Sequence, residues 1–229
     1  MQNASQIAHE GLAFANPMPE ATVDAAIAAL PIPTGAVVLD TGCGRGEILL
    51  RTLRAHPGTR GVGIDLDPQL VAEARSRAAS LPVRFEVADA EAAAPPVDAV
   101  INVGASHAHG GFPAAVAALR ARARIALYGE GFWQQPPSDD FLAALGGASV
   151  GELADLDGLR AAIKEAGFGI VGEWLASSDD WAHYEETLAA NAERHGGSCA
   201  LAYARRIRER RALPRGADTL GFALLVLRA

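Results

Sequence analysis

The sequence predicts an α/β domain of three layers, in which a largely parallel sheet lies between helices. The chain has 229 residues and is 50% hydrophobic, enough for a core that buries about 70% of the surface exposed by the unfolded chain. Short apolar runs alternate with amphipathic segments, as in strands joined by helical crossovers. A glycine-rich turn follows the first apolar run, and ligands of open α/β sheets bind beyond the carboxyl ends of the strands.

Seven apolar runs are predicted to form strands. Residues 36–40, Ala-Val-Val-Leu-Asp, are the first, and they lead directly into the glycine-rich turn. Residues 221–227 are the last, and their apolar character indicates a buried strand. The other five strands are expected at 61–65, 83–88, 98–103, 123–128 and 168–175.

Helices are predicted from apolar residues at helical spacing and from end signals. Pro68 suits a first helical position, and Gly167 lies where a C-terminal cap is expected. Ser178 can cap a helix whose apolar stripe is Trp181, Tyr184 and Leu188. The expected helices are about 45–55, 68–79, 112–121 and 199–211, one around Val23, Ile27 and Leu30, one around Leu156, Leu159 and Ile163, and one from Ser178 to Gly196.

We expect residues 1–229 to form a single domain without internal repeats. Its parts are an N-terminal helical arm (1–31), a core (32–177), a helical insertion (178–212) and the last strand (217–229).

Charge and composition argue against several classes of protein. The 27 acidic and 20 basic residues give a formal charge of -7, whereas a non-specific nucleic-acid binder needs many cations. No apolar stretch is long enough to span a membrane, and the N-terminus lacks the features of a signal peptide. Cys43 and Cys199 have no metal-type spacing. We therefore expect a soluble cytoplasmic protein, a monomer or homodimer, without a metal, nucleic-acid or membrane partner.

The glycine-rich turn, residues 40–47, reads Asp-Thr-Gly-Cys-Gly-Arg-Gly-Glu. A dinucleotide fingerprint would need glycine at position 47, where this chain has Glu47, and no P-loop Gly-Lys-Ser/Thr follows. Asp40 stands two residues before the first glycine, and its carboxylate suits a cationic ligand better than a pyrophosphate.

These residues resemble the class I S-adenosylmethionine-dependent methyltransferases. The family motif V-L-D-x-G-C-G-x-G matches Val38–Gly46, and the family's second strand matches Gly61–Pro68. Val87–Ala90 resembles the acidic position after the third strand, and Val97–Gly104 the strand under the methionine end of the cofactor. The resemblance covers about residues 32–175. It implies a Rossmann-like sandwich with a seven-stranded, mostly parallel sheet and an antiparallel last strand, with S-adenosyl-L-methionine as cofactor and S-adenosyl-L-homocysteine as product.

The resemblance also implies cofactor-binding residues. Asp65 would accept the ribose hydroxyls, because a carboxylate forms strong hydrogen bonds with hydroxyl donors. Leu66 would press on the adenine face, and Asp89 would meet the adenine amino group. The other expected cofactor-binding residues are Asp40, Gly42, Cys43, Gly44, Gly46, Ala90 and Asn102.

The methyl acceptor is expected beyond the fourth and fifth strands. His107 would orient or deprotonate it, since the unperturbed pKa of histidine is near neutrality. The alternative is that one histidine of this loop bonds the loop backbone while the other faces solvent. Aromatic residues of the helical insertion would form a lid or rim over the acceptor, although their helical spacing is also typical of a core. The expected acceptor-binding residues are His109, Glu130, Trp133, Trp181 and Tyr184.

A sulfonium methyl group is already activated, so the predicted reaction needs alignment more than a catalytic triad. The motif of nucleic-acid amino methyltransferases is absent from residues 101–104, and Asn102 replaces an acid of the metal-dependent catechol type. We therefore expect a small-molecule acceptor. The alternatives are a non-catalytic or regulatory protein that retains the fold, transfer of the aminopropyl group, or a NAD(P)-dependent oxidoreductase, which Glu47 disfavours.

Overall fold

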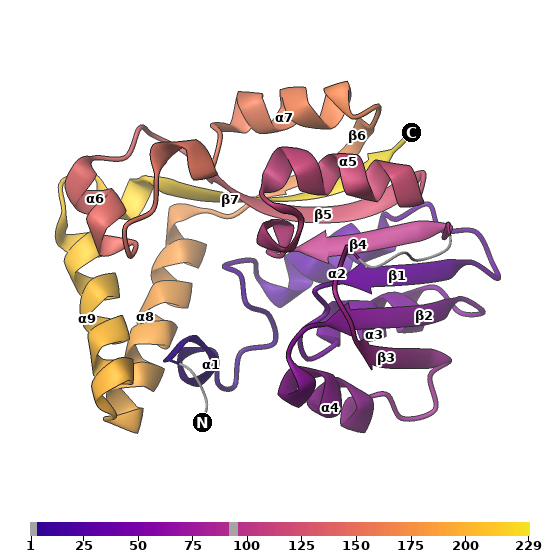
Figure 1. Ribbon diagram of the computed structural model, residues 1–229, viewed down its shortest axis with the longest axis horizontal. Helices are drawn as coiled ribbons and strands as arrows, with labels where there is room; N and C mark the ends of the chain where they lie inside the picture. The colour runs from indigo at the N-terminus through magenta and orange to yellow at the C-terminus, as the bar shows by residue number, and fades with distance from the viewer. Residues whose placement is uncertain (1–3, 92–95) are drawn as a thin grey trace. The chain divides into compact units, whose positions relative to one another are not determined.

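The computed structural model describes residues 4–91 and 96–229 (Figure 1). The first three residues of the expected N-terminal arm lie outside this range. The chain forms two compact units. We call Glu20–Glu130, Asp157–Trp174 and Ala223–Ala229 the core unit, and the residues up to Pro19 with Gly131–Leu156 and Leu175–Phe222 the helical unit.

The chain folds around a seven-stranded sheet with the order β3-β2-β1-β4-β5-β7-β6. Four neighbouring pairs, β1 with β2, β1 with β4, β2 with β3 and β4 with β5, are parallel. The predicted number of strands is confirmed. The strands are β1 (Val37–Thr41), β2 (Arg60–Asp65), β3 (Val83–Val87), β4 (Ala99–Val103), β5 (Ile125–Trp133), β6 (Gly169–Leu175) and β7 (Leu220–Arg228).

The last strand runs antiparallel to its neighbour β5, as expected. The amide of Ala229 donates to the carbonyl of Arg124 at 2.9 Å, and the amide of Gln134 donates to that of Thr219 at 2.9 Å. Residue numbers therefore fall along β7 as they rise along β5. In Figure 1, β7 runs towards the C-terminus, against the arrow of β4.

In the core unit, helices flank the sheet, and other helices form most of the helical unit. In the helical unit, α1, α8 and α9 share a cluster of small and branched apolar residues that includes Ile7, Leu188 and Ile207. None of the helices in the described part of the chain is long and apolar enough to cross a membrane. The helices are α1 (Ala4–Ala8), α2 (Glu20–Ala28), α3 (Glu47–Ala55), α4 (Pro68–Arg77), α5 (Phe112–Arg122), α6 (Asp139–Ala144), α7 (Leu156–Glu165), α8 (Ser178–His195) and α9 (Ser198–Ala212), with 3-10 turns η1 (Ser106–His109), η2 (Val150–Glu152) and η3 (Gly216–Asp218).

Strand β5 is longer than predicted. It continues past Tyr128 to Trp133, so Glu130 is a strand residue. The predicted strand ended at residue 128, and the glycines at 129 and 131, a residue type that weakens strands, do not end the observed one. The ring of Phe132, in the part of β5 that was not predicted, packs directly on Gly221 of β7. A Cβ at Gly221 would lie 2.2 Å from this ring, so only glycine leaves room for it.

Two helix starts also differ from the prediction. Helix α3 begins at Glu47 rather than at 45, because Gly44 and Gly46 hold φ values of +52° and +77°. Ser177, one residue before the predicted cap, caps α8: its hydroxyl accepts the amide of Asp180, and its own amide donates to the Asp180 carboxylate at 2.8 Å. This reciprocal pair is a capping box.

Candidate functional site

The glycine-rich turn between β1 and α3 is fixed to the end of β2 by its backbone. The amides of Gly42 and Cys43 both donate to the carbonyl of Ile64 at 2.9 Å, and the amide of Gly46 donates to the carbonyl of Cys43 at 2.8 Å. Gly42, Gly44 and Gly46 all have positive φ, a conformation that glycine adopts without steric penalty. The spacing of the three glycines is therefore set by the path of the turn.

The three glycines have different surroundings. A Cβ at Gly42 would lie 2.5 Å from the Cβ of Ala105, and one at Gly46 would lie 2.6 Å from the ring of Phe85. At Gly44, apart from the glycine itself and its two neighbours in the chain, no heavy atom of the described residues lies within 4 Å of that position. The turn thus packs tightly at both ends and leaves bare backbone in its middle, where a ligand can approach.

Asp65, at the end of β2, lies beside this bare backbone. One carboxylate oxygen accepts the amide of Gly44 at 2.8 Å, and the other accepts the amide of Asp67 at 2.9 Å. Because each carboxylate oxygen has two lone pairs, both can still accept a hydroxyl. The next residue, Leu66, is 65% exposed. A carboxylate and an apolar side chain therefore stand together at the end of the strand, an arrangement that fits a ribose and a base.

Asp40 is buried in β1, with only 3% of its surface exposed. Burial, together with the negative charge of Asp65, raises the pKa of Asp40 to about 8. A cation bound near it would favour its charged form. Burial also raises the pKa of the Cys43 thiol, so this cysteine is not a thiolate nucleophile at neutral pH.

The turn after β3 lies next to the end of β2. The amide of Ala88 donates to the carbonyl of Asp65 at 3.1 Å. The side chain of Asp89 is exposed and accepts the amide of Glu91 at 2.8 Å. Ala90 is buried. The structure thus brings the two acidic residues expected to bind adenosine into neighbouring turns.

Asn102, at the end of β4, links this strand to β1. Its Nδ2 donates to the carbonyl of Thr41 at 3.1 Å and to the Thr41 hydroxyl at 3.0 Å. Its Oδ1 is buried without a hydrogen-bond partner in residues 4–91 and 96–229. Since buried polar atoms are nearly always paired, this oxygen is available to a donor of a ligand or a water molecule.

The two histidines of η1 have opposite environments. His107 is exposed, whereas His109 is 4% exposed. Burial and the charge of Arg122 lower the pKa of His109, so it is neutral at physiological pH. Its Nε2 has no hydrogen-bond partner within the described part of the chain. Among those same residues, no group of three or more His, Cys, Asp or Glu side chains could hold a metal ion.

Glu130 belongs to a buried pair on β5 that the sequence reasoning missed. The hydroxyl of Tyr128 donates to a carboxylate oxygen of Glu130 at 2.9 Å, and both residues are buried. In the sheet, Tyr128 is in register with Asn102 of β4. The available signal was the two-residue spacing of Tyr128 and Glu130, which places both side chains on one face of a strand.

The remaining acceptor-binding candidates belong to the helical unit. Trp133 is buried, and its Nε1 donates to the carbonyl of Val150 at 2.8 Å. The ring of Trp181 lies 6.0 Å from that of Tyr184, and the hydroxyl of Tyr184 is 2.7 Å from Nε2 of His9. These contacts all lie within their own unit, and the proposed role of the three residues in acceptor binding stays a prediction.

Comparisons with known proteins match this architecture. A family model described as a methyltransferase domain matches residues 38–127. The uncharacterized protein YjhP of Escherichia coli K12 is 34% identical over 166 residues, which are 68% of this chain and 66% of YjhP. The alignment therefore spans just under two thirds of that relative's length. The X-ray structure of YjhP is similar with a TM-score of 0.85 and 27% identity, over 99% of both chains.

Two further solved structures are of S-adenosylmethionine-dependent methyltransferases in complex with S-adenosyl-L-homocysteine. The protein from Geobacter sulfurreducens has a TM-score of 0.84 and 26% identity, over 99% of this chain and 98% of its own. The protein from Thiobacillus denitrificans has a TM-score of 0.80 and 27% identity, over 100% of this chain and 99% of its own. The resemblance seen in the glycine-rich motif is thereby confirmed. The chain therefore carries a methyltransferase domain and is similar over nearly its whole length to S-adenosylmethionine-dependent methyltransferases.

Proposed function

We propose that this chain binds S-adenosyl-L-methionine at the turn between β1 and α3 and transfers its methyl group to a small molecule. The observation that carries the proposal is the pairing of Asp65 with Gly44. A carboxylate with free lone pairs stands beside backbone that no Cβ covers, and an exposed apolar side chain follows it.

Each cofactor-binding residue has a role that its environment supports. Asp65 accepts the ribose hydroxyls, Leu66 covers the adenine, and the exposed carboxylate of Asp89 accepts from the adenine amino group. Asp40 complements the cationic end of the ligand, because a nearby cation returns its carboxyl to the charged form. The turn and strand ends complete the site through Gly42, Cys43, Gly44, Gly46, Ala90 and Asn102.

The bound cofactor supplies a methyl group that is already activated, so the protein's contribution is alignment and the exclusion of water. We assign the acceptor side of the core unit to His107, His109 and Glu130. His107 is exposed and can hold or take a proton from an acceptor that arrives protonated. The buried His109 stays neutral, and Glu130 offers a carboxylate already bonded to Tyr128.

Thermal unfolding with added ligands tests the proposal. S-adenosyl-L-homocysteine, S-adenosyl-L-methionine, NAD and NADP are each added separately. A ligand at about 100 times its dissociation constant adds about 2.7 kcal/mol, which raises the midpoint by roughly 2–4 °C per kcal/mol in a chain of this size. We expect a shift with the two adenosyl-sulfur ligands alone. A shift with a dinucleotide instead, or with none of the four ligands, would contradict the proposal.

A further inference from the structure

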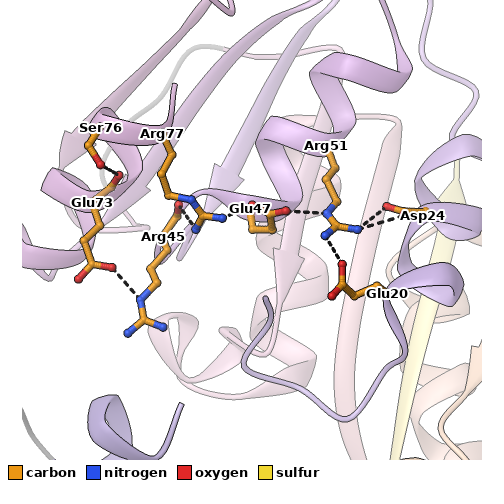
Figure 2. Close-up of polar contacts among 8 residues, drawn as sticks. All are labelled: Glu20, Asp24, Arg45, Glu47, Arg51, Glu73, Ser76 and Arg77. Carbon is orange, nitrogen blue, oxygen red and sulfur yellow. Dashed lines mark hydrogen bonds and ion pairs between the residues drawn. The ribbon is translucent and has the colours of Figure 1, made fainter. Parts of the chain in front are cut away.

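A cluster of charged side chains lies at the start of α3, next to the glycine-rich turn, which we call the cofactor turn; Figure 2 shows how these side chains point toward one another. It joins residues from α2, the turn, α3 and α4, all within the core unit. We call this cluster the ionic brace. Its members are Glu20, Asp24, Arg45, Glu47, Arg51, Glu73 and Arg77.

Arg51 is the centre of the brace. Its Nε donates to the carboxylate of Glu47 at 2.7 Å, one turn earlier on α3. Its Nη1 lies 3.0 Å from both carboxylate oxygens of Asp24, and its Nη2 bonds Glu20. One guanidinium therefore holds three carboxylates from two helices. Its side chain is only 19% exposed, so solvent screens these pairs less than pairs on an open surface.

The second half of the brace holds the turn against α4. Arg77 bonds the second carboxylate oxygen of Glu47 and donates to the backbone carbonyl of Arg45 at 3.3 Å. The side chain of Arg45 makes an ion pair of 2.8 Å with Glu73. The turn residue Arg45 and the first helical residue Glu47 are thus each held from α4.

The brace contacts the cofactor turn itself, so we expect it to affect the conformation of the turn more than the stability of the whole fold. The brace holds positions 45 and 47, which flank Gly46, and position 45 directly follows the ligand-facing Gly44. Glycines at 42, 44 and 46 leave this backbone with high conformational entropy. Contacts that fix Arg45 and Glu47 lower the number of conformations that a ligand must select from.

We propose that Arg51 and Glu47 are positioning residues that hold the cofactor turn in its binding conformation and so raise the affinity for the cofactor. The inference rests on the proposed cofactor site. Neither residue needs to touch the ligand: Glu47 orders the last part of the turn, and Arg51 orients Glu47 and anchors it to α2. Without Arg51, Glu20, Asp24 and Glu47 lose the cation that they share.

The core unit contains a matched control. Arg160 of α7 donates to Glu173 of β6 at 3.0 Å and to Asp157 at 3.0 Å. It is also an arginine shared by carboxylates from two elements, but β6 lies at the far end of the sheet, with β4, β5 and β7 between it and β1. Arg51→Met and Arg160→Met therefore remove similar networks, and only one of these networks reaches the cofactor turn.

The experiment measures two quantities in the wild type, Arg51→Met, Arg160→Met and Glu47→Gln. Calorimetry gives the affinity for S-adenosyl-L-homocysteine, and hydrogen exchange of the unliganded protein gives the opening of residues 42–48. We expect Arg51→Met to weaken binding about tenfold, within the range of indirect couplings, and to speed exchange in this segment. Glu47→Gln keeps the side-chain shape. We expect it to weaken binding and to speed exchange of residues 42–48, each by less than Arg51→Met does. Arg160→Met changes neither, although it lowers the unfolding midpoint.

The outcomes separate this inference from the proposed function. If the wild type does not bind S-adenosyl-L-homocysteine, the proposed function fails, while hydrogen exchange still shows whether the brace orders the turn. If the wild type binds the ligand and Arg51→Met binds it equally well, the positioning role is wrong. Equal losses in Arg51→Met and Arg160→Met would also overturn it, because the effect would then be one of general stability.

Discussion

The ends of β1, β2 and β3 are organised differently from the ends of β4 and β5. On the first side, backbone groups fix the structure: two amides of the turn share the carbonyl of Ile64, and the amide of Gly44 binds Asp65. On the second side, buried side chains do so, and Oδ1 of Asn102 and Nε2 of His109 have no partner in residues 4–91 and 96–229. The first arrangement suits a ligand that is bound through backbone groups, and the second leaves buried polar atoms with which a ligand can pair.

The largest expected effect is the pH dependence that Asp40 gives to stability on the cofactor side. Its pKa in the folded protein, about 8, lies above the ordinary value of 3.8, so the folded chain binds a proton that the unfolded chain releases. This contribution is fully present below pH 3.8 and is lost as the pH rises through about 8. At 1.36 kcal/mol per pKa unit, the loss by neutral pH is on the order of 4 kcal/mol.

Urea unfolding at several pH values tests this prediction. We expect the free energy of unfolding of the wild type to fall between about pH 5 and pH 8, and that of Asp40→Asn to fall much less. An equal fall in the two proteins would mean that Asp40 is ionised in the unliganded structure. A cationic ligand would then bind beside an Asp40 carboxylate that is already negatively charged.

Two glycines of the turn, Gly44 and Gly46, give the next largest effect. Ala at position 46 has a positive φ and a Cβ 2.6 Å from the ring of Phe85, whereas Ala at position 44 has the positive φ alone. We expect Gly46→Ala to lower the free energy of unfolding by about 3 kcal/mol and Gly44→Ala by about 1 kcal/mol. Urea titration of both variants measures the difference. Equal losses of unfolding free energy in the two variants would show that the ring of Phe85 moves aside at no cost in free energy.

Asp65→Ala tests the central contact of the cofactor side. We expect it to reduce the affinity for S-adenosyl-L-homocysteine about ten- to a hundredfold, because the ribose hydroxyls lose a charged acceptor worth about 1.5–3 kcal/mol. Calorimetry measures the change. Asp67→Ala is the control, since Asp67 caps α4 through the amides of Gln69 and Leu70 and is expected to affect stability rather than binding. Unchanged affinity in Asp65→Ala would place the cofactor elsewhere.

The sequence predicted the position of the glycine-rich turn better than the packing of the residues after β4 and in β5, for a physical reason. The glycines and Asp65 act through backbone geometry and strand ends, which local patterns encode. By contrast, His107 and His109 look alike in the sequence, and only tertiary packing exposes one and buries the other. The Tyr128–Glu130 pair was missed because the predicted strand ended at residue 128.

The longer-range contacts could not be predicted at all. Arg51 binds residues 27 and 31 positions earlier in the chain, and no periodicity marks such a pairing. Helices α1 and α6, of five and six residues, are too short to show a helical repeat, and packing within the helical unit stabilises them instead.

The smallest expected effect belongs to His109 and has the opposite sign to that of Asp40. Because burial lowers its pKa below the ordinary 6.5, the unfolded chain binds a proton that the folded chain does not. Its contribution to stability is present above pH 6.5 and is lost as the pH falls through the folded pKa. We expect His109→Gln to lose less stability than the wild type on acidification, as measured by urea unfolding. His107→Gln, at an exposed position two residues away, is expected to follow the wild type. If His107→Gln instead flattens the profile and His109→Gln does not, the burial of His109 does not explain the acid sensitivity of this loop.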